Sequence, residues 1–343
     1  MRYTIISISI LLLLVVLACN VQNNAVQQSM IISEQHEQKL LDKARVYLDS
    51  LPELPNISAD KMAMASIDLG RKLFLDKRLS LNETKSCNSC HDLTTYGVDN
   101  EALSLGFDNV KGTRNTPSVY NATFALAQFW DGRAADLAAQ ARSPILDATE
   151  MGMPDEKTLV QRLIKDPSYQ KMFAAAFPAH KNPVSFENIS TAIGKFEERL
   201  ISYAPFDDYL NGKITALNEQ EKRGLNAFID LGCIPCHSGS ATGGNMYQKF
   251  PQIGRIEDYT GRQNKDEGRY ADTKNAADKR IFKVPSLRNV AKTAPYFHDG
   301  SVATLPEAVK IMAKAQLNTD LSSEEIADIV AFLQTLTGDI SGF

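Results

Sequence analysis

Three features are missing from this chain of 343 residues, and each absence argues against one class of protein. Positive charge is not in excess, because 37 Lys and Arg stand against 41 Asp and Glu; the formal net charge of −4 argues against a nucleic-acid partner. Useful runs of alternating apolar and polar residues are absent, which argues against a β-sheet protein. A membrane-spanning apolar run is also absent, since residues 5–17 make only thirteen apolar-rich positions.

The N-terminus instead has the form of a bacterial export signal. Arg2 precedes the apolar run, and Ala18-Cys19 ends it. We predict a lipoprotein signal peptide at residues 1–18, lipidation of Cys19, and a tether with an N-terminal helix at residues 19–50. The protein would then lie on the periplasmic face of a bacterial membrane, anchored by lipid at Cys19. An ordinary cleaved signal, in which Cys19 has no role, is the alternative.

Cysteine is scarce, and four of the five cysteines lie in two copies of Cys-x-x-Cys-His. The copies are Cys87-Asn88-Ser89-Cys90-His91 and Cys233-Ile234-Pro235-Cys236-His237. In each copy the two thiols can add across the vinyl groups of a haem, and the imidazole can bind the iron. Zinc ribbons bring their cysteine pairs within about 15–20 residues, whereas 143 positions separate Cys90 from Cys233. We therefore predict two covalently bound haem c groups.

Helical periodicity covers most of the chain after the tether. It predicts helices from residue 37 to near Pro52 and at residues 62–74, 158–165, 169–177, 186–200, 219–231, 305–314 and 324–336. We expect residues 92–121, 143–156 and 238–280 to be irregular. A break at residues 204–206 separates the two haem motifs and divides the chain at 51–204 and 205–343. The predicted fold is all-α, with two cytochrome c-like domains that each carry one covalent haem c and are joined at an interface.

The sixth ligand of a haem iron separates an electron carrier from a catalyst. Met312 is the candidate for the second haem, because the only other Met after His237 is Met246, just nine residues later. The alternative for Met312 is an ordinary core methionine.

The first haem has no obvious sixth ligand. No His follows His91 before His180, and the Pro- and Asn-rich surroundings of His180 predict an exposed turn. Residues 92–157 offer Glu150, Met151 and Met153 instead.

A set of longer segments occurs in a fixed order before, between and after the two motifs. The segments are Gly70-Arg71-Lys72-Leu73-Phe74, Arg114-Asn115-Thr116-Pro117, Phe129-Trp130-Asp131-Gly132, Glu150-Met151, Pro285-Ser286-Leu287-Arg288-Asn289, Ala294-Pro295-Tyr296-Phe297-His298 and Met312. From about residue 66 to residue 337 the chain closely resembles the bacterial dihaem cytochrome c peroxidases.

The resemblance implies a role for each matching residue. The first haem would be the low-potential, peroxidatic centre, and the second would be the high-potential electron store with Met312 as its ligand. Trp130 would carry electrons between the haems, and Glu150 would move protons during peroxide cleavage. Residues that match the family at lower specificity are Gln140 and Pro144 in the peroxide pocket, Asn115 and the carbonyls of Thr293 and Pro295 at a calcium site, and His298 near the domain interface without binding iron.

The chain departs from the family at one position. Many members close the peroxidatic haem with a distal His sixteen residues after the haem His, and Phe107 stands at that position here. Phe cannot bind iron. We therefore predict that the first haem of the oxidised protein is five-coordinate or binds only water, and that the enzyme needs no prior reduction of the second haem.

The resulting prediction is a cytochrome-c peroxidase that reduces hydrogen peroxide with electrons from a small periplasmic cytochrome c or cupredoxin. A homodimer is possible in this family. One alternative is a dihaem electron-transfer protein, which would need both irons closed. Another is an oxidase of the methylamine-utilisation type, but that branch has Tyr where this chain has Met312.

Overall fold

The computed structural model describes residues 35, 37–261 and 265–342. The predicted signal peptide, Cys19 and the start of the tether lie outside the described residues. The chain forms two compact units, Met1–Val46 and Tyr47–Phe343. In the first unit, residues 35 and 37–45 are helical, so the predicted N-terminal helix is present but ends at Arg45 instead of near Pro52.

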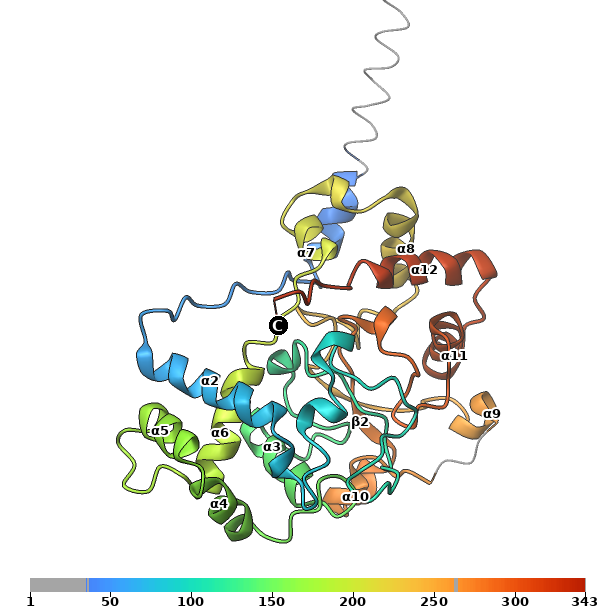
Figure 1. Ribbon diagram of the computed structural model, residues 1–343. Coiled ribbons are helices and arrows are strands. Elements are labelled where there is room, and N and C mark those ends of the chain that lie inside the picture. The colour runs from blue at the N-terminus through green and yellow to red at the C-terminus, as the bar shows by residue number, and fades with distance from the viewer. Residues whose placement is uncertain (1–34, 36, 262–264, 343) are drawn as a thin grey trace, which may run out of the picture. The chain divides into compact units, whose positions relative to one another are not determined.

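The second unit is helical apart from one small sheet (Figure 1). Its α-helices are α2 (Lys61–Leu75), α3 (Leu137–Leu146), α4 (Glu156–Ile164), α5 (Pro167–Ala176), α6 (Phe186–Glu197), α7 (Pro205–Leu210), α8 (Glu219–Asp230), α9 (Ile256–Thr260), α10 (Tyr270–Thr273), α11 (Leu305–Leu317) and α12 (Ser323–Gln334). Its 3-10 turns are η1 (Lys77–Leu79), η2 (Cys87–Ser89), η3 (Leu93–Thr95), η4 (Ala122–Phe124), η5 (Ile214–Ala216), η6 (Ala276–Asp278) and η7 (Val290–Lys292). The strands β1 (Tyr247–Lys249) and β2 (Ile281–Lys283) pair antiparallel.

Two parts of the predicted secondary structure were wrong in detail. Helix α3 enters the stretch expected to be irregular, because Asp136 caps its first turn and the helix tolerates Pro144 near its end. Strand β1 lies inside the third stretch expected to be irregular, and strand β2 begins directly after that stretch. Three residues each are too few to display an alternating pattern. No helix in the described part of the chain is both long and apolar enough to cross a membrane.

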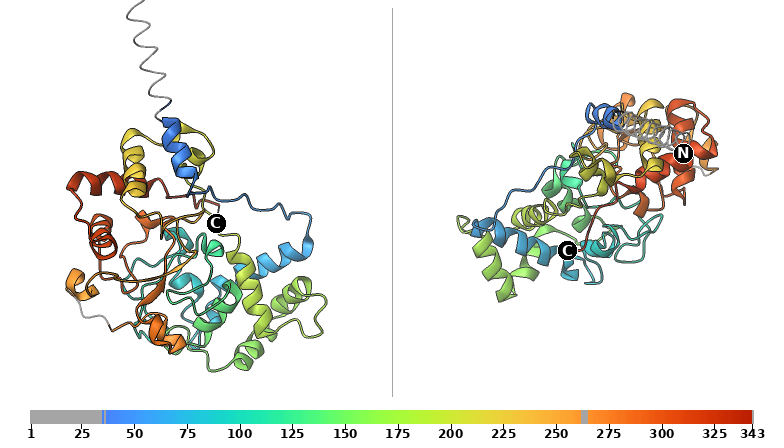
Figure 2. Two further views of the ribbon diagram at one scale, coloured as in Figure 1. Left: turned by 180° about the vertical axis from the view of Figure 1, so that it is seen from behind. Right: turned by 90° about the horizontal axis from the view of Figure 1, so that it is seen from above.

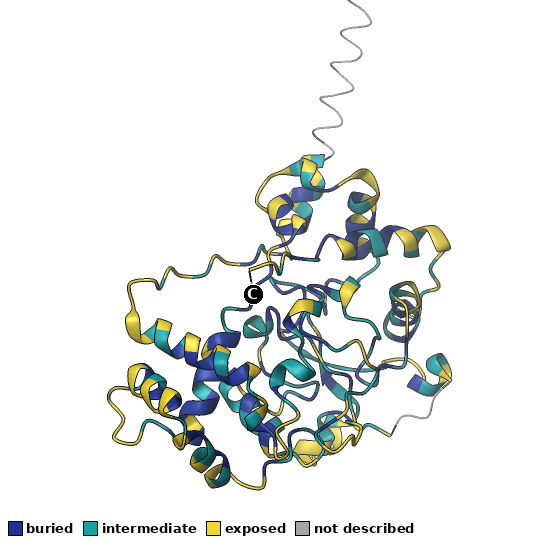
Figure 3. Ribbon diagram, in the orientation of Figure 1, coloured by how far each residue is buried: buried dark blue, intermediate teal, exposed yellow. Residues whose placement is uncertain are grey.

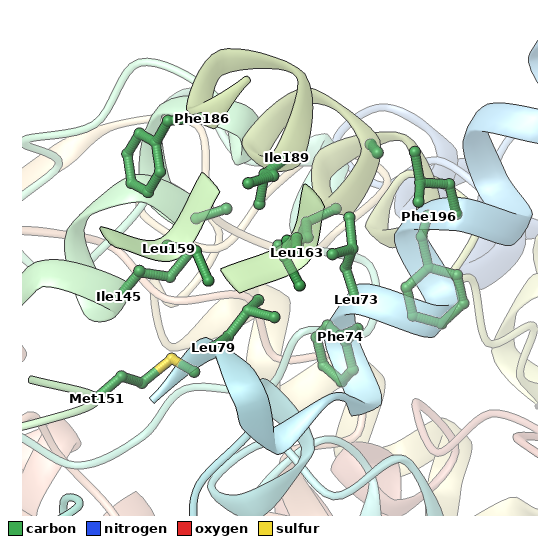
Figure 4. Close-up of a cluster of buried hydrophobic side chains, with 14 of the residues drawn as sticks. Leu73, Phe74, Leu79, Ile145, Met151, Leu159, Leu163, Phe186, Ile189 and Phe196 are labelled. Carbon is green, nitrogen blue, oxygen red and sulfur yellow. The ribbon is translucent and has the colours of Figure 1, made fainter. Parts of the chain in front are cut away.

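Helices α2 and α6 form the core of the first haem half (Figure 4). Leu73 and Phe74 of α2 are fully buried, and Phe74 meets Phe196 of α6 edge to face with 5.4 Å between ring centroids. Gly70 lets the two backbones approach, since a Cβ there would overlap the carbonyl of Ala192. Figure 3 shows the resulting inward-facing buried sides of these helices.

Helices α8 and α12 pack together in the second haem half, on the opposite side of the unit from α2–α6 in both Figure 1 and Figure 2. Phe332 of α12 lies between Phe228 of α8 and Phe206 of α7, at 5.2 Å from each ring. Three aromatic side chains in contact make a large apolar contribution to this core.

A buried polar network joins the two halves. Ser202, between α6 and α7, accepts hydrogen bonds from Asn121 Nδ2 (2.9 Å) and Asn289 Nδ2 (2.8 Å). Asn121 belongs to the first half and Asn289 to the second, and all three residues are buried. Because each amide left unpaired would be costly, this network fixes the two halves against one another.

Candidate active site

The second haem motif lies in a turn directly after α8. Cys233, Cys236 and His237 line a cavity of about 300 Å³, and Met312 of α11 lines the same cavity. The structure therefore brings together the predicted thioether cysteines, the predicted axial His and the predicted sixth ligand. Apolar side chains from α8, α11 and α12 form much of the remaining wall.

The His237 ring has the character of a metal ligand. Its side chain is buried, and burial lowers its pKa to about 4, so it is neutral at neutral pH. Its Nδ1 atom is buried, and the backbone of Thr242 interacts with the ring. Gly243 has φ +118°, and a Cβ there would press on the Pro285 carbonyl and approach the His237 Nδ1 to 3.1 Å. A neutral imidazole beside a free cavity and two thiols fits a covalent haem.

The first haem motif begins in η2, where the Ser86 N–H donates to the Ser89 hydroxyl at 2.9 Å. His91 Nδ1 lies 3.2 Å from the Gly97 carbonyl, which needs a donor. This contact places the proton on Nδ1 and leaves the Nε2 lone pair for iron. Burial lowers the His91 pKa, so the first motif is also consistent with a haem-binding imidazole.

Both motifs are followed by the same turn, with a glycine six residues after the His. The Gly97 N–H donates to the Asp92 carbonyl at 2.8 Å, and the Gly243 N–H donates to the Ser238 carbonyl at 2.9 Å. The residue before each glycine also has positive φ. This matching turn supports equivalent roles for the two motifs, and it went unnoticed in the sequence.

Glu150 lies in a turn after α3, within reach of the first motif. Burial raises the pKa of the Cys87 and Cys90 thiols most, and the charge of Glu150 adds a smaller contribution to both. Burial raises the pKa of Glu150 itself to about 7, with a contribution from Asp147 that Arg133 opposes. A carboxyl with this pKa can both accept and return a proton at neutral pH.

Backbone hydrogen bonds fix the Glu150 turn. The Glu150 N–H donates to the Asp147 carbonyl at 3.0 Å, and the Met151 N–H donates to the Pro144 carbonyl at 3.1 Å. Met151 is 4% exposed and lies in the core of the first half. Gln140 stands one helical turn before Pro144 on α3, so both residues predicted for the peroxide pocket lie on the helix that leads to Glu150.

Phe107 packs against the same turn. Its N–H donates to the Glu150 carbonyl at 2.7 Å, and its own carbonyl accepts from Asn82 Nδ2 at 2.8 Å. A Cβ on Gly152 would overlap the Phe107 ring, so the ring covers that glycine. The residue that replaces the family's distal His is therefore held beside Glu150.

Trp130 lies at the tip of a tight turn that several segments hold. Its Nε1 donates to the Asn115 carbonyl at 2.8 Å, and its carbonyl accepts from the Lys283 N–H of β2 at 2.7 Å. Trp130 also lines the cavity of the second motif. The next residue, Asp131, accepts a buried hydrogen bond from Arg114 at 2.6 Å, which adds to the rigidity of the turn.

The Trp130 turn has a counterpart in the second half that sequence reasoning missed. Asn121 and Asn289 both have positive φ. Each segment also closes with an isolated antiparallel β-bridge, Gln128–Ala134 in the first half and Tyr296–Val302 in the second. The segments share Pro-Ser, Asn, Phe and Asp-Gly at a constant separation of 168 residues, a signal that a search for internal repeats would find.

His298 is the counterpart of Trp130. The two rings meet edge to face with 6.3 Å between centroids, and His298 also stacks on Phe282 at 4.3 Å. His298 is 4% exposed, and burial lowers its pKa. His180, by contrast, lies in an exposed turn, as predicted.

The same repeat relates α3 to α11 and places Pro144 opposite Met312. Each is the eighth residue of its helix, and a capping side chain precedes both helices, Asp136 before α3 and Thr304 before α11. The second site thus has a thioether where the first has a proline, which offers no side-chain ligand.

Asn115, Thr293 and Pro295 all line the cavity of the second motif. Asn115 Nδ2 donates to the Glu101 carbonyl at 2.9 Å, so its oxygen is the atom left for a cation. In residues 35, 37–261 and 265–342, no three His, Cys, Asp or Glu side chains cluster as metal ligands. A site built from one amide and two carbonyl oxygens would not be found by that criterion.

Comparison with known proteins agrees with this geometry. Residues 64–215 match the di-haem cytochrome c peroxidase family, and residues 221–337 match the cytochrome c family. A protein of Pseudomonas aeruginosa named cytochrome c551 peroxidase is 43% identical over 301 residues, which are 87% of this chain and 86% of the relative. The chain belongs to the dihaem cytochrome c peroxidase family. A cytochrome c551 peroxidase of Nitrosomonas europaea is 44% identical over 80% of this chain and 81% of its own length.

Members of the family's other branch are similar as well. A methylamine utilization protein MauG of Methylophilus methylotrophus is 32% identical over 83% of this chain and 86% of its own length. The crystal structure of a MauG-like protein associated with microbial copper homeostasis is 31% identical, with a TM-score of 0.73, and covers 84% of this chain and 95% of that one. The predicted all-α fold with two cytochrome c-like domains, the peroxidase activity and the covalent haem c are confirmed.

Proposed function

We propose that this member of the dihaem peroxidase family reduces hydrogen peroxide at the first haem and stores electrons at the second. Cys87, Cys90 and His91 would hold the first haem, and Cys233, Cys236, His237 and Met312 the second. The haems supply the iron chemistry of peroxide cleavage and electron storage. Hydrogen peroxide takes up two electrons and two protons and gives two waters.

The observation that carries this assignment is the unequal surroundings of the two motifs. Glu150, a carboxyl with a pKa of about 7, lies near the first motif, whereas the second motif shares its cavity with Met312. Glu150 would accept a proton from bound peroxide and return it to the departing oxygen. The Trp130 indole, held at both its ring and its backbone, would carry electrons between the halves.

We further propose that the first haem is open in the fully oxidised enzyme. Phe107 stands at the position of the family's distal His, and Pro144 stands opposite Met312 in the internal repeat. Neither side chain can bind iron. The contacts of Phe107 with the Glu150 turn support a fixed turn, so turnover would not require a prior movement that releases a ligand.

Two measurements on the holoenzyme test these proposals. Peroxide turnover with a reduced small cytochrome c, started from oxidised enzyme, should proceed without a lag. Magnetic resonance spectroscopy of the oxidised enzyme should show one high-spin haem and one low-spin haem. A lag that prior reduction removes, or low-spin signals from both haems, would contradict the open first site.

Four finer proposals complete this function. The electron donor is a small periplasmic cytochrome c or cupredoxin, and the mildly acidic chain suits a basic or neutral partner. The two haem halves divide at 204/205, where α7 begins.

Calcium binds at Asn115 with the carbonyls of Thr293 and Pro295, so chelation should alter activity and calcium should restore it. The mature protein is anchored by lipid at Cys19 on the periplasmic face of a membrane and can form a homodimer; Cys19→Ser should release it from the membrane fraction.

A further inference from the structure

Glu197 is a buried carboxyl group that the proposed peroxidase chemistry does not use. It is the last residue of α6 and is 4% exposed, and its Oε2 atom has no hydrogen-bond partner in the described part of the chain. The next residue, Glu198, is exposed and pairs with Lys195 at 2.9 Å. An ionised carboxyl with a buried oxygen that has no hydrogen-bond partner is costly, so we looked for a role for Glu197.

The helix that carries Glu197 packs against helices whose buried side chains are mainly apolar. Helices α2, α3 and α4 pack against α6. Their buried residues are Ser66, Leu69, Gly70, Leu73 and Phe74 on α2, Leu137, Ala141 and Ile145 on α3, and Leu159 and Leu163 on α4, with no ionisable group in this described set. Burial raises the pKa of Glu197 to about 8 and is the cause of that shift.

Glu197 acts on the first haem's attachment site. Burial raises the pKa of the Cys87 thiol most, and the charge of Glu197 raises it further, with smaller contributions from Cys90 and Glu150. Cys87 also packs against the core that contains Phe196, the residue before Glu197 in the sequence. The charges that act on His91 come from Asp99 instead. If Cys87 holds the first haem, Glu197 would lie on the thioether side of that haem.

We propose that Glu197 takes up a proton when the first haem accepts an electron and releases it when that haem is oxidised. The electron comes from the reduced donor protein that turnover already needs, and the proton comes from water. Glu197 changes from carboxylate to carboxylic acid as the neighbouring haem loses one positive charge, so the buried region keeps the same net charge. The proposal rests on haem attachment at Cys87, which belongs to the proposed function, but it does not need peroxide turnover.

The test is the reduction potential of the first haem as a function of pH, from about pH 5 to about pH 9, in the holoenzyme. In the wild type we expect an interval in which the potential falls with a slope near one proton per electron. Glu197→Gln should lose that slope, because an amide of the same shape cannot exchange the proton. Glu198→Gln, the adjacent exposed carboxyl, is the matched control and should keep it. Glu150→Gln shows how much of the slope comes from Glu150, the second buried acid near Cys87.

A wild-type slope in Glu197→Gln would overturn the proposal. If that variant does not fold, infrared difference spectra of the wild type between its reduced and oxidised forms answer the same question. A carboxylic acid band that appears on reduction and shifts in deuterated water supports a proton on a buried acid, and its absence overturns the proposal. If the wild type showed no peroxide turnover but kept the pH dependence of the first haem's reduction potential, the peroxidase function would be contradicted and the role of Glu197 would stand.

Discussion

Replacing Glu150 by Gln removes one proton acceptor while keeping the size and shape of the side chain. The turn should survive, because backbone groups of Asp147, Met151 and Phe107 hold it and none of these bonds uses the Glu150 carboxylate. General acid–base catalysis typically contributes about 10²–10⁴-fold to a rate. We expect a loss of that order in the rate constant for reaction with peroxide, which corresponds to about 3–6 kcal/mol at about 1.4 kcal/mol per tenfold.

The pH dependence gives a sharper expectation. Burial raises the pKa of Glu150 to about 7, so its carboxylate form is lost as the pH falls through that value. A single group with this pKa is roughly 10% ionised at about pH 6 and roughly 90% ionised at about pH 8. The wild-type rate constant should therefore rise about tenfold between these values, whereas that of Glu150→Gln should stay nearly constant.

The assay is stopped-flow mixing of the oxidised holoenzyme with peroxide, followed at the first haem's absorbance. It needs no electron donor, so donor binding does not enter the rate. Glu156→Gln is a suitable control, because Glu156 is an exposed acid that pairs with Arg142 at the surface. The role of Glu150 would be refuted if its Gln variant reacted within a few-fold of the wild type, or if the wild-type rate did not change between pH 6 and 8.

Three further substitutions test the surrounding framework. Met312→Ala should change the absorption spectrum of the second haem and lower its reduction potential, whereas an unchanged spectrum would exclude the thioether as ligand. Trp130→Phe should slow the oxidation of the reduced second haem by peroxide in stopped-flow experiments, and an unchanged rate would exclude the indole from the electron path. Arg288→Leu should lower the free energy of unfolding in denaturant titrations by about 3–5 kcal/mol, since it leaves the Asp207 carboxylate of a buried 2.7 Å ion pair without its cationic partner. Arg288→Lys should lose less, and equal losses in the two variants would argue against the charge as the cause.

The sequence was most informative where chemistry demands a fixed local pattern. Two Cys-x-x-Cys-His motifs specify covalent haem without any long-range information, and amphipathic periodicity predicted helices close to α2, α6, α8 and α12. Helix α3 was missed because Pro144 normally ends a helix, while the Asp136 cap and the packing of α3 on α6 outweigh it.

The rest of the site depends on contacts between distant segments. Glu197 is an ordinary helical acid in the sequence, and only the packing of α6 reveals that it is buried. The pairing of Phe107 with the Glu150 turn joins segments more than forty residues apart, so no local pattern predicts it. The order of residues along the chain does not show which carboxyl group is buried away from water, and the pKa of each acid depends on that burial.

The internal repeat permits a direct exchange of function between the two sites. Pro144→Met would place the second site's thioether at the equivalent position of α3. The Pro144 carbonyl that accepts the Met151 N–H is kept, and the new residue gains an N–H that can donate to the Gln140 carbonyl one turn earlier. If α3 and α11 present this position to their haems in the same way, the first haem of the oxidised variant should become low-spin and react more slowly with peroxide. Pro144→Ala, which removes the ring without adding a ligand, should keep the high-spin signal. A high-spin first haem in Pro144→Met would show that the repeat relates the backbones but not the ligand positions, and the openness of the first site would then depend on Phe107 alone.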